Sequence, residues 1–413
     1  MGIHVAAGNV RFALCALLLA AAPARAAEWS IEPSLDLGAI YNDNITLTAS
    51  PHPTVWGWQL SPAVVFSGAT ETLNVNGGLR LGFFRYYGEQ GLNHNDYYFT
   101  SKSSYKTDRD VLGLNLAAIS DPTLITELET TGVVVAYRQR TQLTAAPSWT
   151  RSLTETTSLT TTYSYSGVNY ADTSGTSLID YSDQTATVGL QTILDEGNLA
   201  SVTAYYDRYK TNPSSFLANT YGSQAGFDHR FSETLRGSIV VGARKTRSTN
   251  TTDAFLCDGP ILFGICFGNL TPVTLVSEQT STGWTLNAGL EKRWETTTVG
   301  GQLSREINPT GVGSLVQTDR LQIVWTNQWS PTLTSSVNAS AYQSQYISGN
   351  ISNSNSRYYR VEPKLNWRMT EDLVLSARYS YARVNYESSA VSASQNAVYL
   401  TMIYVWPKIS ISR

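Results

Sequence analysis

The sequence predicts an all-β protein, a transmembrane antiparallel up-and-down β-barrel of about 18 strands over residues 27–413, with short periplasmic turns and long extracellular loops. Three observations predict this fold. Apolar and polar residues alternate along most segments, short turns and longer loops follow one another along the chain, and aromatic residues stand at one end of many strands. The 24 Tyr residues, against only 3 Met, agree with a chain that favours strands.

The first 26 residues are set apart from the predicted barrel. Arg11 precedes an apolar run over residues 12–22, and Ala24-Arg25-Ala26 has the small-residue pattern of a cleavage site. Residues 1–26 are therefore predicted to be a secretory signal peptide, with a buried core helix as the alternative. Without Arg11 and Arg25, the 29 basic residues of the chain fall to 27 against 32 acidic ones, a net charge of −5.

The alternation is clearest in the segment from residue 359 to residue 369. Tyr359, Val361, Leu365 and Trp367 share one parity, whereas Arg360, Glu362, Lys364 and Arg368 share the other. Successive side chains of a strand point to opposite faces of the sheet. One face of this segment is therefore apolar and aromatic, and the other is charged.

Turns and loops divide the chain regularly. Eight short turns rich in Thr, Ser, Asp, Glu or Pro and nine longer loops separate 18 strands, an even number as in single-chain outer-membrane barrels. The loops are expected near residues 43–54, 88–94, 120–131, 171–181, 212–219, 247–279, 307–315, 347–356 and 386–394. After residue 26, no apolar run approaches the roughly 20 residues that a membrane helix needs.

Aromatic residues mark one end of nearly every descending strand: Phe66, Tyr105, Trp149, Phe231, Trp294, Trp329, Trp367 and Trp406. Such rings have an apolar body and a polar edge, which suits a lipid–water boundary. We therefore predict an interfacial aromatic belt that includes Trp149, Phe231, Trp294, Trp329, Trp367 and Trp406. A soluble β-sandwich would also alternate, but this row of rings would then be an exposed patch. The blades of a propeller would need four short strands per repeat.

Closure of the barrel requires the last strand, residues 396–406, to pair with the first, residues 33–42. The last strand resembles the C-terminal recognition strand of outer-membrane proteins, which usually ends in an aromatic residue. Here PKISISR follows Trp406 and departs from that pattern.

Basic residues are expected to predominate on the polar, lumen-facing parity. We place these side chains there: Arg80, Lys102, Arg138, Arg140, Arg230, Arg236, Arg244, Arg293, Arg320, Arg360, Lys364, Arg368 and Arg378. The acids expected there are fewer: Asp36, Asp207, Asp228, Glu291, Glu306 and Glu362. Charged side chains in a pore select by sign, so we hypothesise a preference for anionic solutes or an anionic polymer. The alternative is that these charges pair across strands and leave no selectivity.

Two cysteines remain after the predicted leader, Cys257 and Cys266, and an oxidising compartment favours a disulfide between them. They lie in the longest and most apolar loop, residues 247–279. An 18-stranded barrel leaves an aqueous channel unless something plugs it. This loop is the predicted constriction, folded inward as a lid, with an outward partner surface as the alternative. Its apolar members are Phe255, Leu256, Ile261, Leu262, Phe263, Ile265 and Phe267.

A first strand of the type PSLDLGAIYNDN, over residues 33–44, resembles the start of β-barrel porins of the BBP2 type. That group includes barrels associated with exopolysaccharide biosynthesis loci. The resemblance implies an outer-membrane barrel that, in some members, lets a secreted polysaccharide cross. It carries no catalytic residues over to this chain, and the triplet Asn42-Asp43-Asn44 is also an ordinary way to leave a strand.

No enzyme is expected. The three histidines outside the leader are His52, His94 and His229, and the sequence contains no G-x-S-x-G, H-E-x-x-H or glycine-rich phosphate loop. Ser50 or Asp96 could approach a loop histidine, but spacing alone does not place them. We therefore assign no catalytic, cofactor or metal residues.

The predicted function is an outer-membrane pore for hydrophilic solute or polymer, with exopolysaccharide export favoured. A diffusion porin for uptake and a structural or adhesive barrel without transport are the alternatives. The expected partners are outer-membrane lipid, the barrel assembly machinery, a polysaccharide substrate and a periplasmic polysaccharide-export protein, and no nucleic acid.

Overall fold

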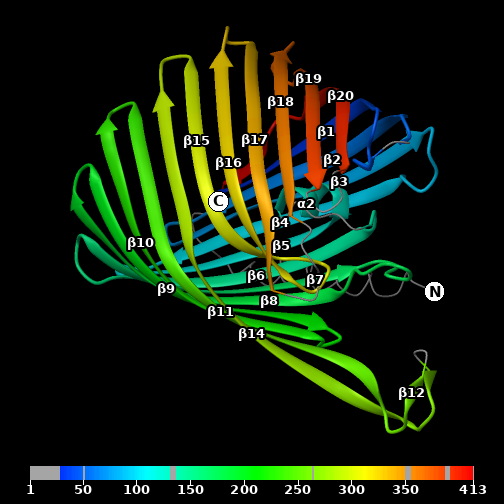
Figure 1. The fold of residues 1–413 in the computed structure, drawn as a ribbon. Coiled ribbons are helices and arrows are strands. Elements are labelled where there is room, and N and C mark those ends of the chain that lie inside the picture. Colours follow the sequence, from blue (N-terminus) through cyan, green and yellow to red (C-terminus); the bar gives the residue numbers. More distant parts are fainter. Residues whose placement is uncertain are drawn as a thin grey trace.

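The computed structural model describes residues 28–49, 52–130, 136–262, 265–348, 355–386 and 391–412, so the predicted signal peptide lies outside the described residues. Eighteen antiparallel strands form one closed β-barrel, which confirms the predicted fold class (Figure 1). In chain order the barrel strands are β1 (Glu28–Asn42), β2 (Val55–Ala69), β3 (Leu73–Tyr87), β4 (His94–Lys106), β5 (Asp110–Pro122), β6 (Gln139–Ser152), β7 (Thr157–Tyr170), β8 (Asp180–Asp195), β9 (Asn198–Asn212), β10 (Phe216–Ser232), β11 (Leu235–Cys257), β14 (Leu270–Arg293), β15 (Thr297–Pro309), β16 (Leu315–Gln328), β17 (Leu333–Ser348), β18 (Ser356–Arg368), β19 (Leu373–Tyr386) and β20 (Val391–Val405).

The barrel closes where its last strand meets its first, as predicted. Strands β1 and β20 pair from Ser34↔Val405 to Asn42↔Ala397. The residues after Trp406 continue this pairing, since the short strand β21 (Ile409–Ser412) runs along residues 28–31 of β1. The unusual C-terminal tail therefore completes the hydrogen-bonded edge of the first strand.

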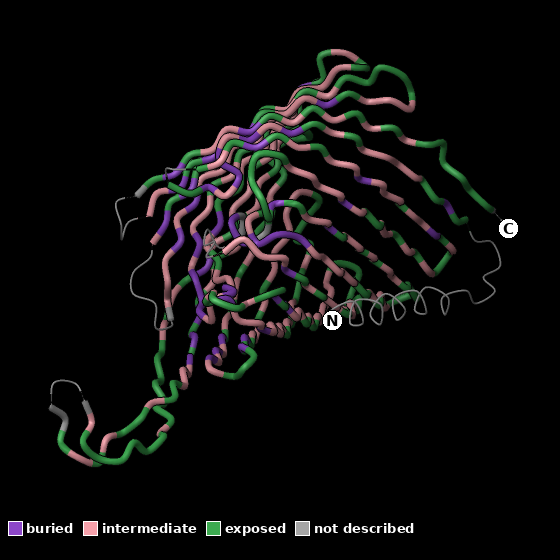
Figure 2. The backbone as a smooth tube through the Cα atoms, turned by 90° about the vertical axis from the view of Figure 1, so that its right-hand side faces the viewer, coloured by how far each residue is buried: buried purple, intermediate pink, exposed green. Residues whose placement is uncertain are grey.

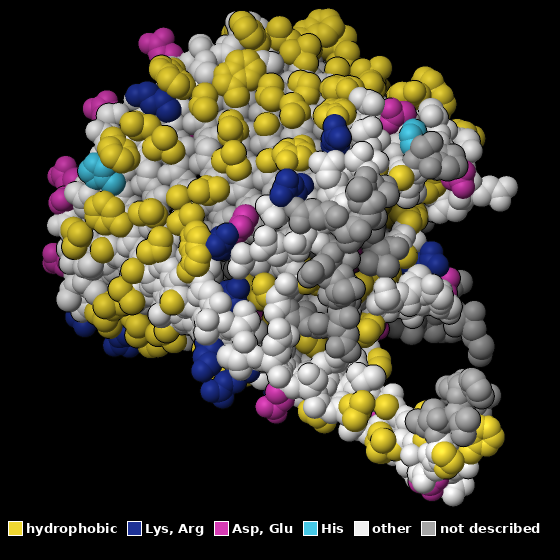
Figure 3. All heavy atoms as spheres, viewed as in Figure 1, with side chains coloured by type: hydrophobic (Ala, Val, Ile, Leu, Met, Phe, Trp, Pro, Cys, Tyr) yellow, Lys and Arg dark blue, Asp and Glu magenta, His cyan; other side chains and the backbone are white. Residues whose placement is uncertain are grey.

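The two faces of the wall differ as the alternation predicts. On β18, Tyr359, Val361 and Trp367 point outward and are 44%, 42% and 47% exposed. Arg360 and Lys364, on the opposite parity, line an internal cavity. Figure 3 shows apolar side chains spread over the outer face of the barrel. In hydrocarbon every backbone group needs an internal partner, and a closed sheet with an apolar exterior meets this need.

The buried residues gather inside the loop end of the barrel, where inward-folded loops meet the wall (Figure 2). One cluster joins Tyr170, Tyr181, Tyr209 and Leu315, and a second joins Leu47, Leu128 and Tyr342. A third cluster contains Ile45, Val55 and Leu92. The core of this protein is thus a set of contacts across the mouth of the lumen.

A short helix, α2 (Thr123–Thr130), follows β5 within the predicted loop 120–131 and lies inside the barrel (Figure 1). No helix within the described residues is long and apolar enough to cross a bilayer.

The segment predicted as the longest loop is mostly strand. Beyond Asn250, where pairing with β10 ends, β11 and β14 pair only with each other from Thr251↔Val276 to Cys257↔Leu270. A two-stranded tip, β12 (Ile261–Leu262) and β13 (Ile265–Cys266), completes this hairpin. We call residues 251–276 the arm; it projects away from the barrel (Figures 1 and 2).

Candidate functional site: the lumen and its closed mouth

The strand register places the charged side chains of the inner wall. Residues that are cross-strand partners point to the same face of the sheet. The pairs Asp36↔Ser61, Ala63↔Arg80 and Arg80↔Tyr98 therefore identify the inward-pointing residues of β1 to β4. Continued around the barrel, this register puts most of the basic residues assigned to the lumen on the inner face: Arg80, Lys102, Arg140, Arg230, Arg236, Arg244, Arg293, Arg320, Arg360, Lys364, Arg368 and Arg378. Arg138 precedes β6 at the mouth, where its Nε donates to the Asp172 carbonyl at 2.8 Å.

Acidic side chains pair with many of these bases, and two of them are shared. Glu291 forms ion pairs with Arg236, at 3.0 Å, and with Arg293. Glu362 lies 2.7 Å from Arg360 and 3.6 Å from Arg378. A third acid, Asp36, lies 3.5 Å from Arg80. In the first two clusters, one carboxylate therefore contacts two guanidinium groups.

The lumen also contains acids that were not among those expected there. Asp96, Asp121 and Asp183 share the inner face near the extracellular ends of β4, β5 and β8. Glu127 adds a buried carboxylate on α2. The position of Asp96 could have been predicted from Lys102, because both are even-numbered residues of β4 and therefore point to the same face. The mouth is therefore of mixed charge, and the basic excess belongs to the deeper lumen.

Helix α2 crosses the lumen and is fixed at both walls. On one side, the Tyr170 hydroxyl of β7 donates a hydrogen bond to Glu127, and the Arg140 Nε lies 4.0 Å from the same carboxylate. On the other side, the Tyr342 hydroxyl of β17 donates to the Leu128 carbonyl. Burial raises the pKa of Glu127, although the Tyr170 hydrogen bond and the Arg140 charge oppose the shift.

The first residue of α2 is hydrogen-bonded to the residues that precede β6. The Thr123 amide donates to the Arg138 carbonyl at 2.9 Å, and the Thr123 hydroxyl donates to the Ala136 carbonyl at 2.6 Å. These bonds bring together the two chain ends that leave and re-enter the wall. Deeper in the mouth, Leu128 packs against Leu47 and Tyr358.

The loop between β15 and β16 also closes the mouth. The Tyr209 hydroxyl donates to the Thr310 carbonyl at 2.8 Å, and the Ile179 amide donates to the Gly311 carbonyl at 2.7 Å. Glycine at residue 311 permits this close approach, because an added Cβ would overlap the Tyr170 hydroxyl and force Tyr170 or Glu127 to shift. This loop, α2 and the inner wall of β7–β9 therefore meet at one point.

Internal cavities remain beside this closure and below it. A cavity of about 610 Å³ lies beside α2 and is lined by Arg80, Arg360, Lys364, Arg378 and several tyrosines. Another, of about 770 Å³, lies toward the periplasmic turns between β8 and β16. The barrel is thus hollow, and its inward-folded loops obstruct its mouth.

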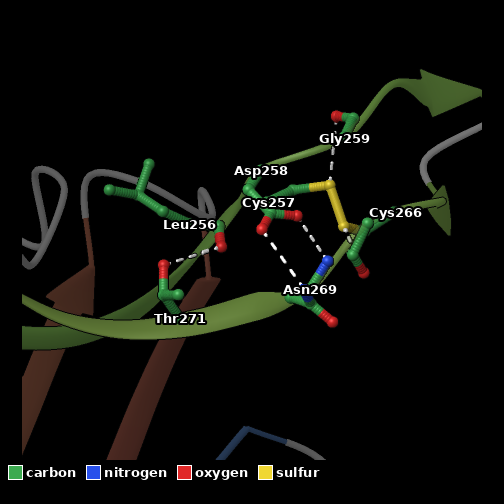
Figure 4. The surroundings of a disulfide bond; sticks show 8 residues. Leu256, Cys257, Asp258, Gly259, Cys266, Asn269 and Thr271 are labelled. Atoms are coloured by element: carbon green, nitrogen blue, oxygen red, sulfur yellow. Dashed lines mark hydrogen bonds between the residues drawn. A yellow bond between two sulfur atoms is a disulfide. The ribbon is translucent and has the colours of Figure 1, made fainter.

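The predicted lid over residues 247–279 is wrong in position. The arm points away from the lumen, and Phe255, Leu256 and Phe267 are 69%, 59% and 65% exposed. Cys257 and Cys266 form the expected disulfide near its tip, where Asn269 also bonds to Asp258 (Figure 4). The constriction that this loop was expected to provide is formed by α2 and the β15–β16 loop.

The aromatic residues predicted to form the interfacial belt occupy outward-pointing positions in the strand register. Phe231, Trp294, Trp329, Trp367 and Trp406 are each more than a third exposed at the turn end of the barrel, and Trp149 donates its indole N–H to Asp110 at 2.9 Å.

The histidines do not assemble a hydrolytic site among the described residues. His94 lies on the inner wall with its Nε2 3.7 Å from Asp96, and its Nδ1 contacts Tyr137 and the Leu92 carbonyl. His229 faces outward and bonds to Asn198 at 2.7 Å, while Ser50 lies outside the described residues. Within the described ranges, no cluster of three or more His, Cys, Asp or Glu side chains could hold a metal ion.

Comparisons with known proteins give only a general likeness. No protein-family model and no curated protein matches the chain. Among solved structures it is similar to OccAB3 of Acinetobacter baumannii, with 12% identity over 92% of this chain and 99% of that chain and a TM-score of 0.47. It is similar to Pseudomonas aeruginosa OpdQ, with 10% identity over 92% and 99% and a TM-score of 0.46. It is also similar to P. aeruginosa OccK2 (OpdF) in complex with glucuronate, with 9% identity over 91% and 97% and a TM-score of 0.47.

At this level of identity and superposition, the likeness supports no functional assignment. The barrel itself has a closed wall of 18 strands, an apolar exterior and a polar, charged interior. These features are those of an outer-membrane β-barrel.

Proposed function

We propose that this barrel passes anionic hydrophilic solutes or an anionic polymer across the outer membrane, and that its inward-folded mouth is a closed state of the pore. The observation that carries the proposal is the excess of basic over acidic side chains on the inner wall below the mouth, where Glu291 and Glu362 each contact two arginines. Lys364, beside Glu362 on the same face, adds a further positive charge. In a water-filled channel with low-dielectric walls, this excess raises the local concentration of anions.

Export of an exopolysaccharide is the substrate proposal, and it rests on the resemblance at residues 33–44. A chain of acidic sugars would fit the basic lumen, and a periplasmic export protein would deliver it. Uptake of small anions through the same channel is the second candidate, since an aqueous pore carries solute down its gradient in either direction.

The charge balance can be tested by ion selectivity. Purified barrel is reconstituted in a planar bilayer under a tenfold KCl gradient, for which perfect anion selectivity gives about 59 mV at zero current. We expect a zero-current potential of the anion-selective sign, and a shift toward the cation-selective sign in the double variant Arg236→Glu, Arg293→Glu. The matched control is Arg109→Glu, a charge reversal in an exposed turn outside the lumen. A cation-selective wild-type current would refute the proposal.

A further inference from the structure

The barrel wall has one seam where neighbouring strands separate. Strands β14 and β15 pair from Arg293↔Thr298 to Leu286↔Arg305, and their pairing stops there. Beyond this point, β14 continues with β11 alone as far as Leu270, while β15 continues with β16 alone as far as Pro309↔Leu315. The extracellular half of β14 therefore has a free edge, and the ends of the two strands diverge (Figure 1).

The end of the β15–β16 hairpin lies inside the barrel, behind that free edge. Ile307, which belongs to the outward parity of β15, packs against the cluster formed by Tyr181, Tyr209 and Phe216 on the inner wall. Arg244, on the inner face of β11, donates to Gln317 of β16 at 3.1 Å. At the upper half of the seam, the wall thus overlaps itself, with β15–β16 inside and β11–β14 outside. A cavity of about 500 Å³ lies between the overlapping layers.

The register of the seam leaves room for a second arrangement. If the ladder continued upward from Leu286↔Arg305, the next partners would be Thr285↔Glu306, Trp284↔Ile307, Gly283↔Asn308 and Thr282↔Pro309. Each pair has matching parity, with Glu306 inward beside Thr285 and Ile307 outward beside the Trp284 indole. Pro309 has no amide hydrogen, so the ladder would end there without an unpaired donor.

We propose that the β14–β15 seam is the gate of the pore, and that the pore opens when the β15–β16 hairpin swings outward and completes the ladder with β14. This inference concerns regulation and rests on the proposed pore function. In the structure the hairpin is tucked inward, which gives the closed state. The swing withdraws Thr310 and Gly311 from Tyr209 and Ile179, and it removes Gly311 from its place against Glu127 and Tyr170.

The two arrangements exchange one set of favourable contacts for another. The tucked state buries Leu315, packs Ile307 against the inner wall and satisfies the Thr310 and Gly311 carbonyls. The completed ladder would instead satisfy backbone groups of residues 282–285 on the free edge of β14. A hairpin that can pack in two discrete ways is the kind of bistable element that switches use.

An engineered disulfide tests the open arrangement. The pair Thr282→Cys, Pro309→Cys joins residues that become neighbours only when the ladder is complete. The matched control pair, Asn287→Cys, Ser304→Cys, joins residues that are already paired in the closed state. Both pairs are added to the full chain with Cys257 and Cys266 intact. Disulfide formation is measured by mass spectrometry after thiol labelling, independently of conductance in planar bilayers.

We expect the 282–309 disulfide to form on oxidation and to raise the open probability at least tenfold, reversibly on reduction, whereas the control disulfide forms without that change. The proposal is overturned if only the control disulfide forms. It is also overturned if the 282–309 disulfide forms without added conductance while a variant with residues 124–135 replaced by a short Gly-Ser linker conducts. If that linker variant and all cross-linked forms carry no current, the pore function itself fails.

Discussion

Removal of the Glu127 carboxylate should release α2 from the wall and open the pore. Glu127 accepts a hydrogen bond from Tyr170 and lies 4.0 Å from the Arg140 Nε, and Arg140 is only 5% exposed. In Glu127→Ala, the closed state would hold a buried guanidinium without this carboxylate and a tyrosine hydroxyl without its acceptor.

The size of the effect follows from the geometry. Removing one partner of a buried ion pair costs about 3–5 kcal/mol, and the 4.0 Å separation favours the lower end. The cost falls on the closed state alone, because withdrawal of α2 lets water reach Arg140. A difference of about 3 kcal/mol changes the open-to-closed ratio about 100-fold.

The assay is single-channel recording in planar bilayers. We expect brief rare openings of the wild type to become long openings in Glu127→Ala. Glu127→Gln retains an acceptor for Tyr170 and should give a smaller increase. Glu155→Ala, in an exposed turn, is the control that removes an acid elsewhere. An unchanged open probability in Glu127→Ala, in folded barrels, would refute the role assigned to this contact.

Two further predictions rest on the same geometry. Lys364→Glu should lower the anion-to-cation permeability ratio several-fold, read from the zero-current potential, because it reverses a charge in the cavity beside α2; equal potentials for Lys364→Glu and wild type would contradict the basic-lumen account. Deletion of residues 255–267 should leave conductance unchanged, because the arm lies outside the lumen, and a change comparable to that in Glu127→Ala would restore the arm as a lid.

The barrel itself could be predicted because its determinants are local and repeated. Alternation within each strand and the turn residues between strands specify 18 strands, and the pairing of residues 396–406 with 33–42 follows from closure. The disulfide follows from two nearby cysteines in an exported chain. The same parity rule puts Arg236, Arg293 and Lys364 on one face without any knowledge of the partners.

The closure of the mouth could not be predicted, because it depends on contacts between distant segments. The α2 sequence TLITELET has no strong capping signal and is too short to reveal a helix. Its place is determined by Tyr170 and Tyr342, which lie 43 and 214 residues after the residues that they contact, Glu127 and Leu128. The β15–β16 loop is likewise held by Tyr209, 101 residues away.

The arm was misjudged for a different reason. Its Cys-Asp-Gly-Pro stretch indicates a loop, and its apolar residues suggested burial in the lumen. Thr and Val on either side favour strands, however, so β11 and β14 continue past the rim and carry the apolar tip outward. Exposure of Phe255 and Phe267 shows that an apolar loop does not have to fold inward.

The most direct measurement is the conductance of a barrel without its α2 obstruction. Residues 124–135 are replaced by a short Gly-Ser linker between Thr123 and Ala136, and the variant is compared with wild type in planar bilayers under a KCl gradient. We expect a large, steady, anion-selective current in the variant and a mostly closed wild type. The absence of added current in a correctly folded variant would contradict the claim that inward-folded segments close an otherwise open pore.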